Sequence, residues 1–210
     1  MKIKKADLTR EKETQILRAA QQRFIAYGYS KVTMDEIAED IGMAKASLYY
    51  YFPTKDDIFR GVIRHEQTDF LQQLQSIDKK LTATEKIRSY FQHRINFSSQ
   101  IFSLSWHNRQ IWPSMKPIFK NLFSNFADEE ILLLKKFLRE GKRTKEFSIS
   151  SPDQMAQLMF HVVQGLRIRL FHVDHDVASY EEIHKALEKE TLLFIKIILN
   201  GIQTRRINHV

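Results

Sequence analysis

Lysine, hydroxyl and tyrosine side chains gather, without a single acid, in the stretch from Ile41 to Lys55. Lysine and hydroxyl groups bind phosphate oxygens, and basic, small and aromatic side chains can approach base edges in a groove. We expect phosphate contacts from Thr33, Ser47, Tyr49 and Lys55, and base-edge contacts from Lys45, Ala46 and Tyr50. The alternative at this point is an ordinary surface helix that happens to lack acidic residues.

Two short helices are predicted to position these side chains. The first begins at Thr33, which has capping-box spacing with Glu36, and it ends at Gly42, because glycine adopts positive φ without steric cost. Its apolar face consists of Met34, Ile37, Ala38 and Ile41. The second runs from about Ala44 to Tyr50 and ends before a proline, with inward positions at Ile41, Ala44, Leu48 and Phe52. Two short helices around a glycine-containing turn are typical of the helix-turn-helix unit.

Two longer helices are predicted to flank this unit. One runs from about Thr9 to Tyr27 and ends at Gly28, with a core stripe of Ile16, Leu17, Ala20, Phe24 and Tyr27. The other begins at Thr54, which can act as its N-cap, and continues to about Lys79. The N-terminal part therefore predicts a three-helix bundle from which a fourth helix leads to the rest of the chain.

The same region resembles TetR-family transcriptional regulators. The run IGMAKASLYYYFPTKDDIF is similar to the end of that family's DNA-binding region, where a Tyr-x-Tyr-Phe element, a turn and a lysine end the recognition helix. Tyr49, Tyr51, Phe52 and Lys55 match this element, whereas Ala46 stands where many members carry glycine. Upstream, AAQQRFIAYGYSKVTMDEIAEDIG also resembles the family. The resemblance covers roughly residues 10–60 and implies a DNA-binding regulator.

The remaining chain is predicted to be helical as well. Thr82 and Glu85 open a helix to about Phe97 or Ser99. Pro113 and Pro117 break the pattern, so a short helix is followed by one from about Pro117 to Glu140, which ends at Gly141. A polar loop over 142–151 leads to two long helices, near 152–171 and 180–204, the second capped by Ser179 and Glu182.

These elements predict an all-α fold, which the scarcity of glycine and proline also favours. We expect a helix-turn-helix DNA-binding domain over residues 1–53. We expect a larger helical effector-binding and dimerisation domain over residues 54–210.

Residues 97–126 are the most aromatic part of the chain. Bulky rings around broken helices can leave an apolar cavity, although the simpler alternative is that each ring belongs to the core. TetR-like regulators place an effector pocket in this half. On that basis we expect a small apolar or aromatic effector to contact Phe97, Phe102, Trp106, Met115, Phe119, Phe123, Met159, Phe160 and Gln164. Candidate polar groups of the pocket are His93, Asn96, His107 and Asn108.

The last two long helices are rich in Leu, Ile, Val and Met. The stripe of the first is Met155, Leu158, Met159, Val162, Val163, Leu166 and Leu170, and the inward positions of the second are Leu187, Thr191, Phe194, Ile195, Ile198 and Ile202. Gly165 costs a helix roughly 1 kcal/mol against alanine, so we expect it to permit close approach of another helix. TetR-like proteins dimerise by packing these two helices against the same pair of a second subunit, which implies a homodimer.

Composition favours an anionic partner such as DNA or an acidic membrane. The net charge is +8 and the pI is about 9.6, although most of the basic excess lies outside the first 60 residues. Cysteine is absent, which excludes disulfides and thiolate metal sites and agrees with a reducing cytoplasm. No signal peptide or membrane-spanning apolar run is visible. We expect a cytoplasmic protein with no cofactor, no metal and no membrane partner.

An enzyme and a membrane-binding helix are the rival functions. Two-metal carboxylate bundles need two Glu-x-x-His motifs, and this chain has one, from Glu181 to His184. His172, Asp174 and His175 form another possible ligand cluster, in a polar loop where solvated histidines are the simpler interpretation. The basic end IQTRRINHV could lie on a membrane, but a solvated C-terminal turn is the preferred interpretation.

None of these motifs provides the set of residues that a catalytic site needs. We therefore expect a non-enzymatic, ligand-responsive regulator of double-stranded DNA. The expectation that it is a repressor comes from the family resemblance alone.

Overall fold

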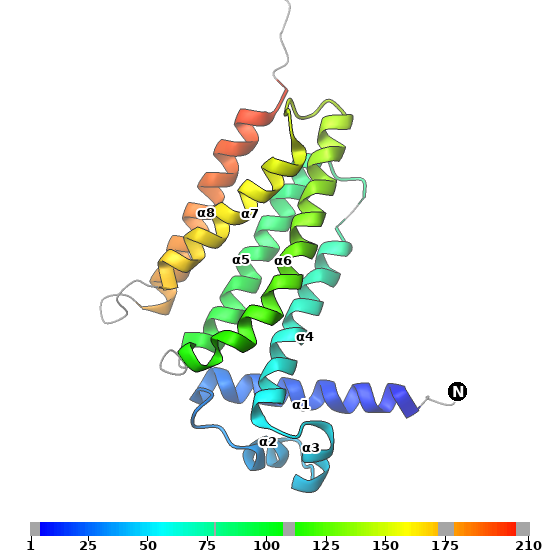
Figure 1. Ribbon diagram of the computed structural model, residues 1–210, viewed down its shortest axis with the longest axis vertical. Coiled ribbons are helices and arrows are strands. Elements are labelled where there is room, and N and C mark those ends of the chain that lie inside the picture. Colours follow the sequence, from blue (N-terminus) through cyan, green and yellow to red (C-terminus); the bar gives the residue numbers. More distant parts are fainter. Residues whose placement is uncertain (1–4, 78, 107–111, 172–178, 205–210) are drawn as a thin grey trace, which may run out of the picture. The chain divides into compact units, whose positions relative to one another are not determined.

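The computed structural model describes residues 5–77, 79–106, 112–171 and 179–204, and gives only the backbone at 5–6, 102–106, 112–121, 169–171 and 180. Eight helices form in this part of the chain (Figure 1): α1 (Lys5–Tyr27), α2 (Met34–Asp40), α3 (Lys45–Tyr51), α4 (Lys55–Gln75), α5 (Ala83–Trp106), α6 (Trp112–Arg143), α7 (Pro152–Phe171) and α8 (Tyr180–Ile202). The described residues contain no strand beyond an isolated bridge between Phe147 and Gln203. The predicted all-α class is confirmed.

Contacts group the chain into two compact units. The first holds Met1–Asp69 and Gln100–Phe123, and the second holds Phe70–Ser99 and Ser124–Val210. Residues 1–53 fall wholly in the first unit, and α4 contributes residues to both. The functional division into domains 1–53 and 54–210 stays a prediction.

In the first unit, α1 packs on α2 and α2 on α3 around an apolar core. Its buried residues include Ile16, Ala20 and Phe24 of α1, Ile37 of α2, Leu48 of α3 and Phe59 of α4. Arg23 of α1 donates through Nε and Nη2 to the two carboxylate oxygens of Asp40. This bidentate pair fixes the end of α2 against α1, as guanidinium and carboxylate groups do when their planes match.

Local capping signals act here as predicted. The backbone N–H of Thr33 donates to Glu36 Oε2 at 2.8 Å, and the N–H of Glu36 donates to Thr33 Oγ1 at 3.3 Å. Gly28 and Gly42 have φ values of 80° and 59°, in the left-handed region that favours glycine. The short helices and their turn are therefore set by neighbouring residues in the sequence.

Two predicted core positions of this unit are wrong. Tyr27 is 60 % exposed, because α1 ends there and the ring lies under the Arg23 guanidinium, 5.9 Å from it, instead of entering the core. Ala44 is exposed because it is the N-cap of α3, with an extended backbone at φ −62° and ψ 138°. α1 also begins earlier than predicted, at Lys5.

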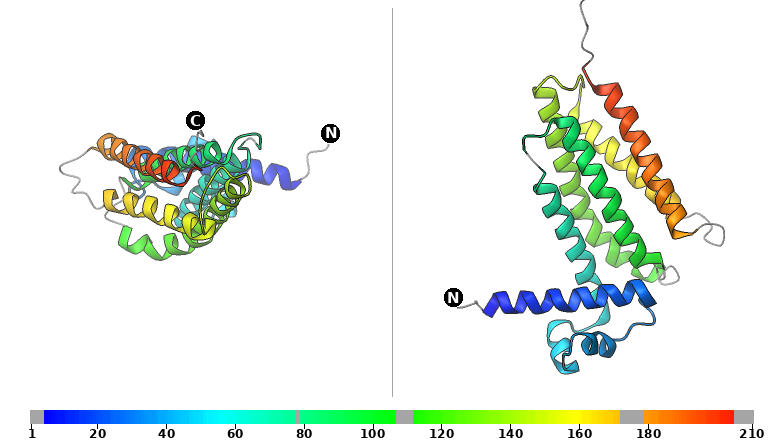
Figure 2. Two further views of the ribbon diagram at one scale, coloured as in Figure 1. Left: turned by 90° about the horizontal axis from the view of Figure 1, so that it is seen from above. Right: turned by 180° about the vertical axis from the view of Figure 1, so that it is seen from behind.

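In the second unit, α7 lies beside α8, and the parts of α5 and α6 that belong to it also run side by side (Figures 1 and 2). The core includes Phe70, Leu74, Ile87, Phe91, Phe97, Phe126, Leu134, Leu138, Met159, Leu187, Ile195 and Leu199. Of the predicted inward stripe of α8, Leu187, Thr191, Ile195 and Ile202 are buried, and Phe194 and Ile198 are half-buried. The predicted orientation of α8 is confirmed.

The loop between α6 and α7 joins distant parts of this unit. The carboxylate of Glu146 accepts the backbone N–H groups of Ala83 and Thr84, both at 2.9 Å, and so caps α5. Ser148 N–H donates to the Ile202 carbonyl at 2.7 Å. The start of α5 and the end of α8 are thus both bonded to the loop.

Gly141 does not end a helix, contrary to the prediction. α6 continues to Arg143, and the ring of Phe147 lies so close to Gly141 that an added Cβ would overlap it. The left-handed residue after the helix is Lys145, at φ 59°. Gly141 therefore serves close packing of the loop on the helix.

The predicted short helix before Pro117 is also wrong. α5 extends to Trp106, and α6 begins at Trp112 and passes through Pro113 and Pro117. Pro113 stands in the first turn, where backbone N–H groups have no acceptor within the helix, so the absence of its N–H removes no helical hydrogen bond. Pro117 removes only one backbone hydrogen bond of the helix. α4 ends at Gln75, before the predicted end, because the Ser76 hydroxyl donates to the Gln73 carbonyl at 2.7 Å.

Candidate functional site

The outward face of α3 carries most of the predicted DNA-contacting residues. Leu48 is fully buried and anchors the helix, with Phe52 half-buried after it. The exposed residues are Lys45, Ala46, Ser47, Tyr49 and Tyr50, and Tyr50 is 82 % exposed. One surface thus presents an ammonium, a hydroxyl and two phenol rings. Their contacts with DNA stay a prediction.

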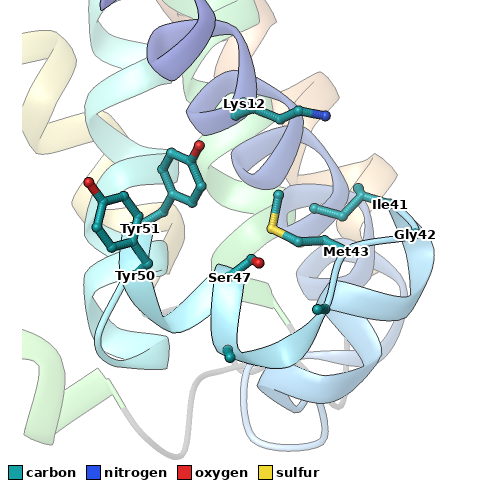
Figure 3. Close-up of a pocket in the computed structure, with 9 residues that line it drawn as sticks. Lys12, Ile41, Gly42, Met43, Ser47, Tyr50 and Tyr51 are labelled. Carbon is teal, nitrogen blue, oxygen red and sulfur yellow. The ribbon is translucent and has the colours of Figure 1, made fainter. Parts of the chain in front are cut away.

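An open hollow of about 620 Å³ adjoins this face (Figure 3). Ser47, Tyr50 and Tyr51 line it from α3, Met43 from the α2–α3 turn, and Lys12 from α1. The Lys12 ammonium donates to Gln15 Oε1 at 3.2 Å and remains exposed. Sequence reasoning missed Lys12, because nothing distinguished it from the other basic residues of α1 before the fold placed it beside α3.

Lys45 has an acidic neighbour that the acid-free stretch conceals. Its Nζ lies 2.7 Å from Asp35 Oδ2 of α2, and this bond raises the pKa of Lys45. Both side chains are more than half exposed. An exposed pair of this kind contributes little to stability, so Lys45 can exchange the carboxylate for a phosphate or a base.

Lys55 and Thr33 are already bonded within the protein. Lys55 Nζ donates to the carbonyls of Tyr29 and Val32, each at 2.8 Å, and lies 4.3 Å from the centre of the Tyr29 ring. Burial lowers the pKa of Lys55. Thr33 Oγ1 donates to Glu36 Oε2 at 2.8 Å. Their predicted phosphate contacts are untested, and their observed role is to hold the chain before α2.

Phe97, a predicted effector residue, packs in the core of the second unit. Its ring centre lies 4.8 Å from that of Phe70 and 5.2 Å from that of Phe126. Met159 and Phe160 are buried, and Phe123 and Gln164 are half-buried. The side chains of Phe102, Trp106, Met115 and Phe119 lie outside the described residues. An apolar pocket built from this set stays a prediction.

A buried polar cluster in the second unit escaped the sequence analysis. Arg94 of α5 is 2 % exposed, and its Nε donates to Glu130 Oε1 of α6 at 2.9 Å. The Tyr90 hydroxyl donates to the same oxygen at 2.9 Å. The sequence did contain a signal for this cluster. Three polar residues spaced four apart lie on the same face of α5 as core residues: Lys86, Tyr90 and Arg94.

The polar residues that the sequence analysis named for the pocket do not belong to this buried cluster. Asn96 is exposed, so it cannot serve as a polar group inside a pocket, and His93 is half-buried beside Arg94. His107 and Asn108 lie outside the described residues. The error arose because histidine and asparagine are expected in binding sites, whereas a buried arginine is rare without a partner.

Burial determines the ionisation of this cluster. Burial raises the pKa of Glu130, against the effect of the neighbouring Arg94 cation. Burial and the like charge of Arg94 lower the pKa of Arg167 of α7 to about 10. Burial, reinforced by Glu130, also raises the pKa of Tyr90. Arg94 and Arg167 both line a narrow gap within the second unit that is too small for a water-sized sphere.

The rival site patterns gain no geometric support in the described part of the chain. No group of three or more His, Asp or Glu side chains that could hold a metal ion is found there. His172, Asp174 and His175 lie outside it. None of the helices described is long and apolar enough to cross a membrane.

Comparisons with known proteins agree with the fold. The family model described as "Bacterial regulatory proteins, tetR family" matches residues 16–62, which hold α2, α3 and their packing partners in α1 and α4. The nucleoid occlusion factor SlmA of Vibrio vulnificus (strain YJ016) is 26 % identical over 151 residues, 67 % of this chain and 74 % of that protein.

Two solved structures resemble almost the whole chain. A transcriptional regulator from Cytophaga hutchinsonii ATCC 33406 is 31 % identical, with a TM-score of 0.79, and covers 90 % of this chain and 97 % of its own. A regulator from Saccharomonospora viridis in complex with choline shares the fold at 20 % identity, with a TM-score of 0.63 and coverage of 93 % and 99 %. Since the helix-turn-helix geometry, the family model and a whole-chain relative point the same way, the chain belongs to the TetR family of DNA-binding transcriptional regulators.

Proposed function

We propose that this protein is a homodimeric repressor that binds a palindromic operator and is released from it by a small-molecule effector. The exposed face of α3 is the observation that carries the proposal. On this face Lys45, Ala46 and Tyr50 are exposed and are proposed to approach base edges, and the exposed Ser47 and Tyr49 are proposed to bind phosphates, while the buried Leu48 anchors the helix. Lys12, across the hollow, is a further candidate for a phosphate contact.

Dimerisation through α7 and α8 is supported by their outward faces. Leu158 of α7 and Leu193 and Ile197 of α8 are each more than half exposed. A Cβ added to Gly165 would meet no heavy atom within 4 Å, so this glycine has no packing function within its own subunit. Exposed apolar residues and a small residue on adjacent helices suit contact with a second copy, and two copies would double the length of DNA that is read.

Effector binding is assigned to residues 54–210, with residues 1–53 as the DNA-binding domain. Gln164 supports the assignment, because it lines the narrow gap of the second unit together with apolar Val163 and Leu187. α4 contributes residues to both units, so a change in its setting can pass from one to the other along a single helix. The proposed effector is a small apolar or aromatic molecule.

The test measures binding of the protein to an operator that has been selected from random duplexes. Binding is followed by a fluorescence-anisotropy titration at several salt concentrations. Tyr50→Ala should relax discrimination at particular base pairs, and Lys45→Ala should weaken binding. Tyr27→Ala and Lys136→Ala are matched controls, since both residues are exposed but lie outside α3. Operator binding by both α3 variants that equals wild type would show that this face does not read DNA.

A further inference from the structure

An exposed ion pair joins the starts of the two helices of the helix-turn-helix unit. Asp35 belongs to the first turn of α2, and Lys45 is the first residue of α3. Lys45 Nζ lies 2.7 Å from Asp35 Oδ2, and the two side chains are 58 % and 59 % exposed. Both residues belong to the first compact unit. Because Lys45 is on the outward face of α3, the Asp35 carboxylate lies beside the side chains that are expected to contact DNA.

The start of α2 is capped without this carboxylate. The capping box is formed by Thr33 and Glu36, and both of its hydrogen bonds are present. Within the described part of the chain, the Asp35 side chain is bonded to Lys45 of the next helix instead. An exposed ion pair contributes little to folding stability, so this pair is available for recognition.

Each member of the pair keeps hydrogen-bonding capacity. An ammonium has three N–H donors, and the bond to Asp35 uses one of them. A carboxylate has about four acceptor sites on its two oxygens, and the bond from Lys45 occupies one. The pair can therefore donate and accept at the same time, through two groups that lie one hydrogen bond apart.

The major-groove edge of a G·C base pair has the complementary arrangement. Guanine presents N7 and O6 as acceptors, and cytosine presents its N4 amino group as a donor. Guanine O6 and cytosine N4 are bonded to each other, so they too lie about 2.9 Å apart. Lysine on guanine and aspartate on cytosine are both known specific contacts. In an A·T pair the amino group separates the two acceptors, adenine N7 and thymine O4, so one ammonium does not contact both.

We propose that Lys45 and Asp35 act as one unit that selects a G·C base pair in each half-site of the operator. Lys45 donates to guanine O6 and N7, and Asp35 accepts from cytosine N4. The inference rests on the proposed function, because α3 has to lie in the major groove, and it names a base pair that this face reads. Asp35 is thereby a specificity-determining residue on α2, outside the set expected from the sequence.

The carboxylate also restrains Lys45. A free lysine has a flexible stem and binds phosphates whatever the base sequence. The bond to Asp35 holds the ammonium at the start of α3, and phosphates repel the carboxylate itself. Loss of Asp35 should therefore raise the affinity for random DNA and lower the discrimination between base pairs.

The test is selection from a random duplex pool by the wild type, Lys45→Met and Asp35→Ala, followed by anisotropy titration of the selected operator. The wild type should select one G·C pair in each half-site that neither variant selects. Replacement of that pair by A·T should weaken wild-type binding roughly 5- to 150-fold, and this factor should be about fivefold smaller in Asp35→Ala. Loss of preference at different positions in the two variants, or at an A·T pair, would overturn the proposal.

Asp128→Ala is the matched control, because it removes the same charge from an exposed position of α6 in the second unit. It should leave the selected sequence and the G·C factor unchanged. Asp35→Ala should melt close to the wild-type temperature, since the pair is exposed. An affinity change in Asp35→Ala that is equal for every duplex would show that Asp35 acts only as a charge, and would refute the reading of a base pair.

The double variant tests whether the two residues act together. Asp35→Ala combined with Lys45→Met should discriminate as well as Lys45→Met alone, because residues that act as one unit do not have additive effects. Losses of discrimination that add in the double variant would refute the shared role.

The same selections separate this inference from the proposed function. Altered selection by Lys45→Met with unchanged selection by Asp35→Ala would refute the paired reading and leave α3 as the helix that reads DNA. Unchanged selection by Lys45→Met, Asp35→Ala and Tyr50→Ala would contradict both.

Discussion

The two units differ in how their interior polar groups are bonded. In the described part of the first unit, Gln21 donates to Glu66 Oε1 at 2.7 Å, and Lys55 donates to two backbone carbonyls at 2.8 Å. In the second unit, Arg94 and Thr191 each keep a buried atom without a hydrogen-bond partner among the described residues. Among the residues that the structure describes, no buried side-chain atom of the first unit lacks a hydrogen-bond partner, whereas Arg94, Gln164 and Thr191 of the second unit each have one that does.

Their surfaces differ as well. α3 in the first unit exposes an ammonium, a hydroxyl and phenols, whereas α7 and α8 in the second expose aliphatic residues such as Leu158 and Ile197. A polar partner suits the first surface and an apolar one suits the second. The comparison shows that the half-buried Lys55 is bonded to backbone carbonyls of its own unit, whereas the buried Arg94 keeps a donor atom that the described residues do not bond.

Removing Arg94 should have the largest effect on stability. Arg94→Met leaves Glu130 buried without its cation, so the free energy of unfolding should fall by about 3–5 kcal/mol. Arg139→Met is the matched control, because its pair with Asp153 is exposed and should matter little. Urea denaturation monitored by circular dichroism gives both values. A loss in Arg94→Met no larger than in the control would contradict the account of the buried pair.

Removing Lys55 should have a smaller effect, confined to the first unit. Lys55→Met keeps the aliphatic stem but loses two charge-assisted bonds, which should cost about 1.5–3 kcal/mol. Lys45→Met, at an exposed pair, serves as the control in the same denaturation experiment. Unchanged stability of Lys55→Met together with weaker operator binding would show that Lys55 acts on DNA alone.

Gly165→Leu tests the apolar surface of the second unit. The monomer should lose little stability, because an added side chain meets open space, while overpacking should weaken the dimer by roughly 1–3 kcal/mol. Gln157→Leu is the control at another exposed position of α7. Sedimentation at micromolar concentration should show dimers for the wild type and control and monomers for Gly165→Leu. Dimers that persist in Gly165→Leu would place the interface elsewhere.

Features set by neighbouring residues were predictable from the sequence. The capping boxes of Thr33 and Ser179, the left-handed Gly42 and the buried Leu48 all follow from spacings within a single helix or turn. The outward set on α3 follows from the same periodicity. Local rules decide such features because few other residues take part in them.

Features set by distant residues were not predictable. The Arg94–Glu130 pair, the capping of α5 by Glu146 and the bonds of Lys55 join parts far apart in the chain. Spacing within α5 places Arg94 on the core-facing side of that helix, but it does not identify the partner of any of these groups. Proline rules failed at Pro117 because a long helix with many other bonds tolerates the loss of one. The partners of these groups thus became visible only in three dimensions.

Selection of DNA from a random duplex pool by the wild-type protein tests the central claim most directly. The account predicts enrichment of palindromes whose half-site centres lie about 34–36 Å apart or at a multiple of that distance. It also predicts affinity for them roughly 10³-fold or more above that for random DNA, lost or redistributed in Tyr50→Ala. A pool that shows no enrichment, or enrichment of sites without two-fold symmetry, would contradict the reading of operator DNA by paired α3 helices.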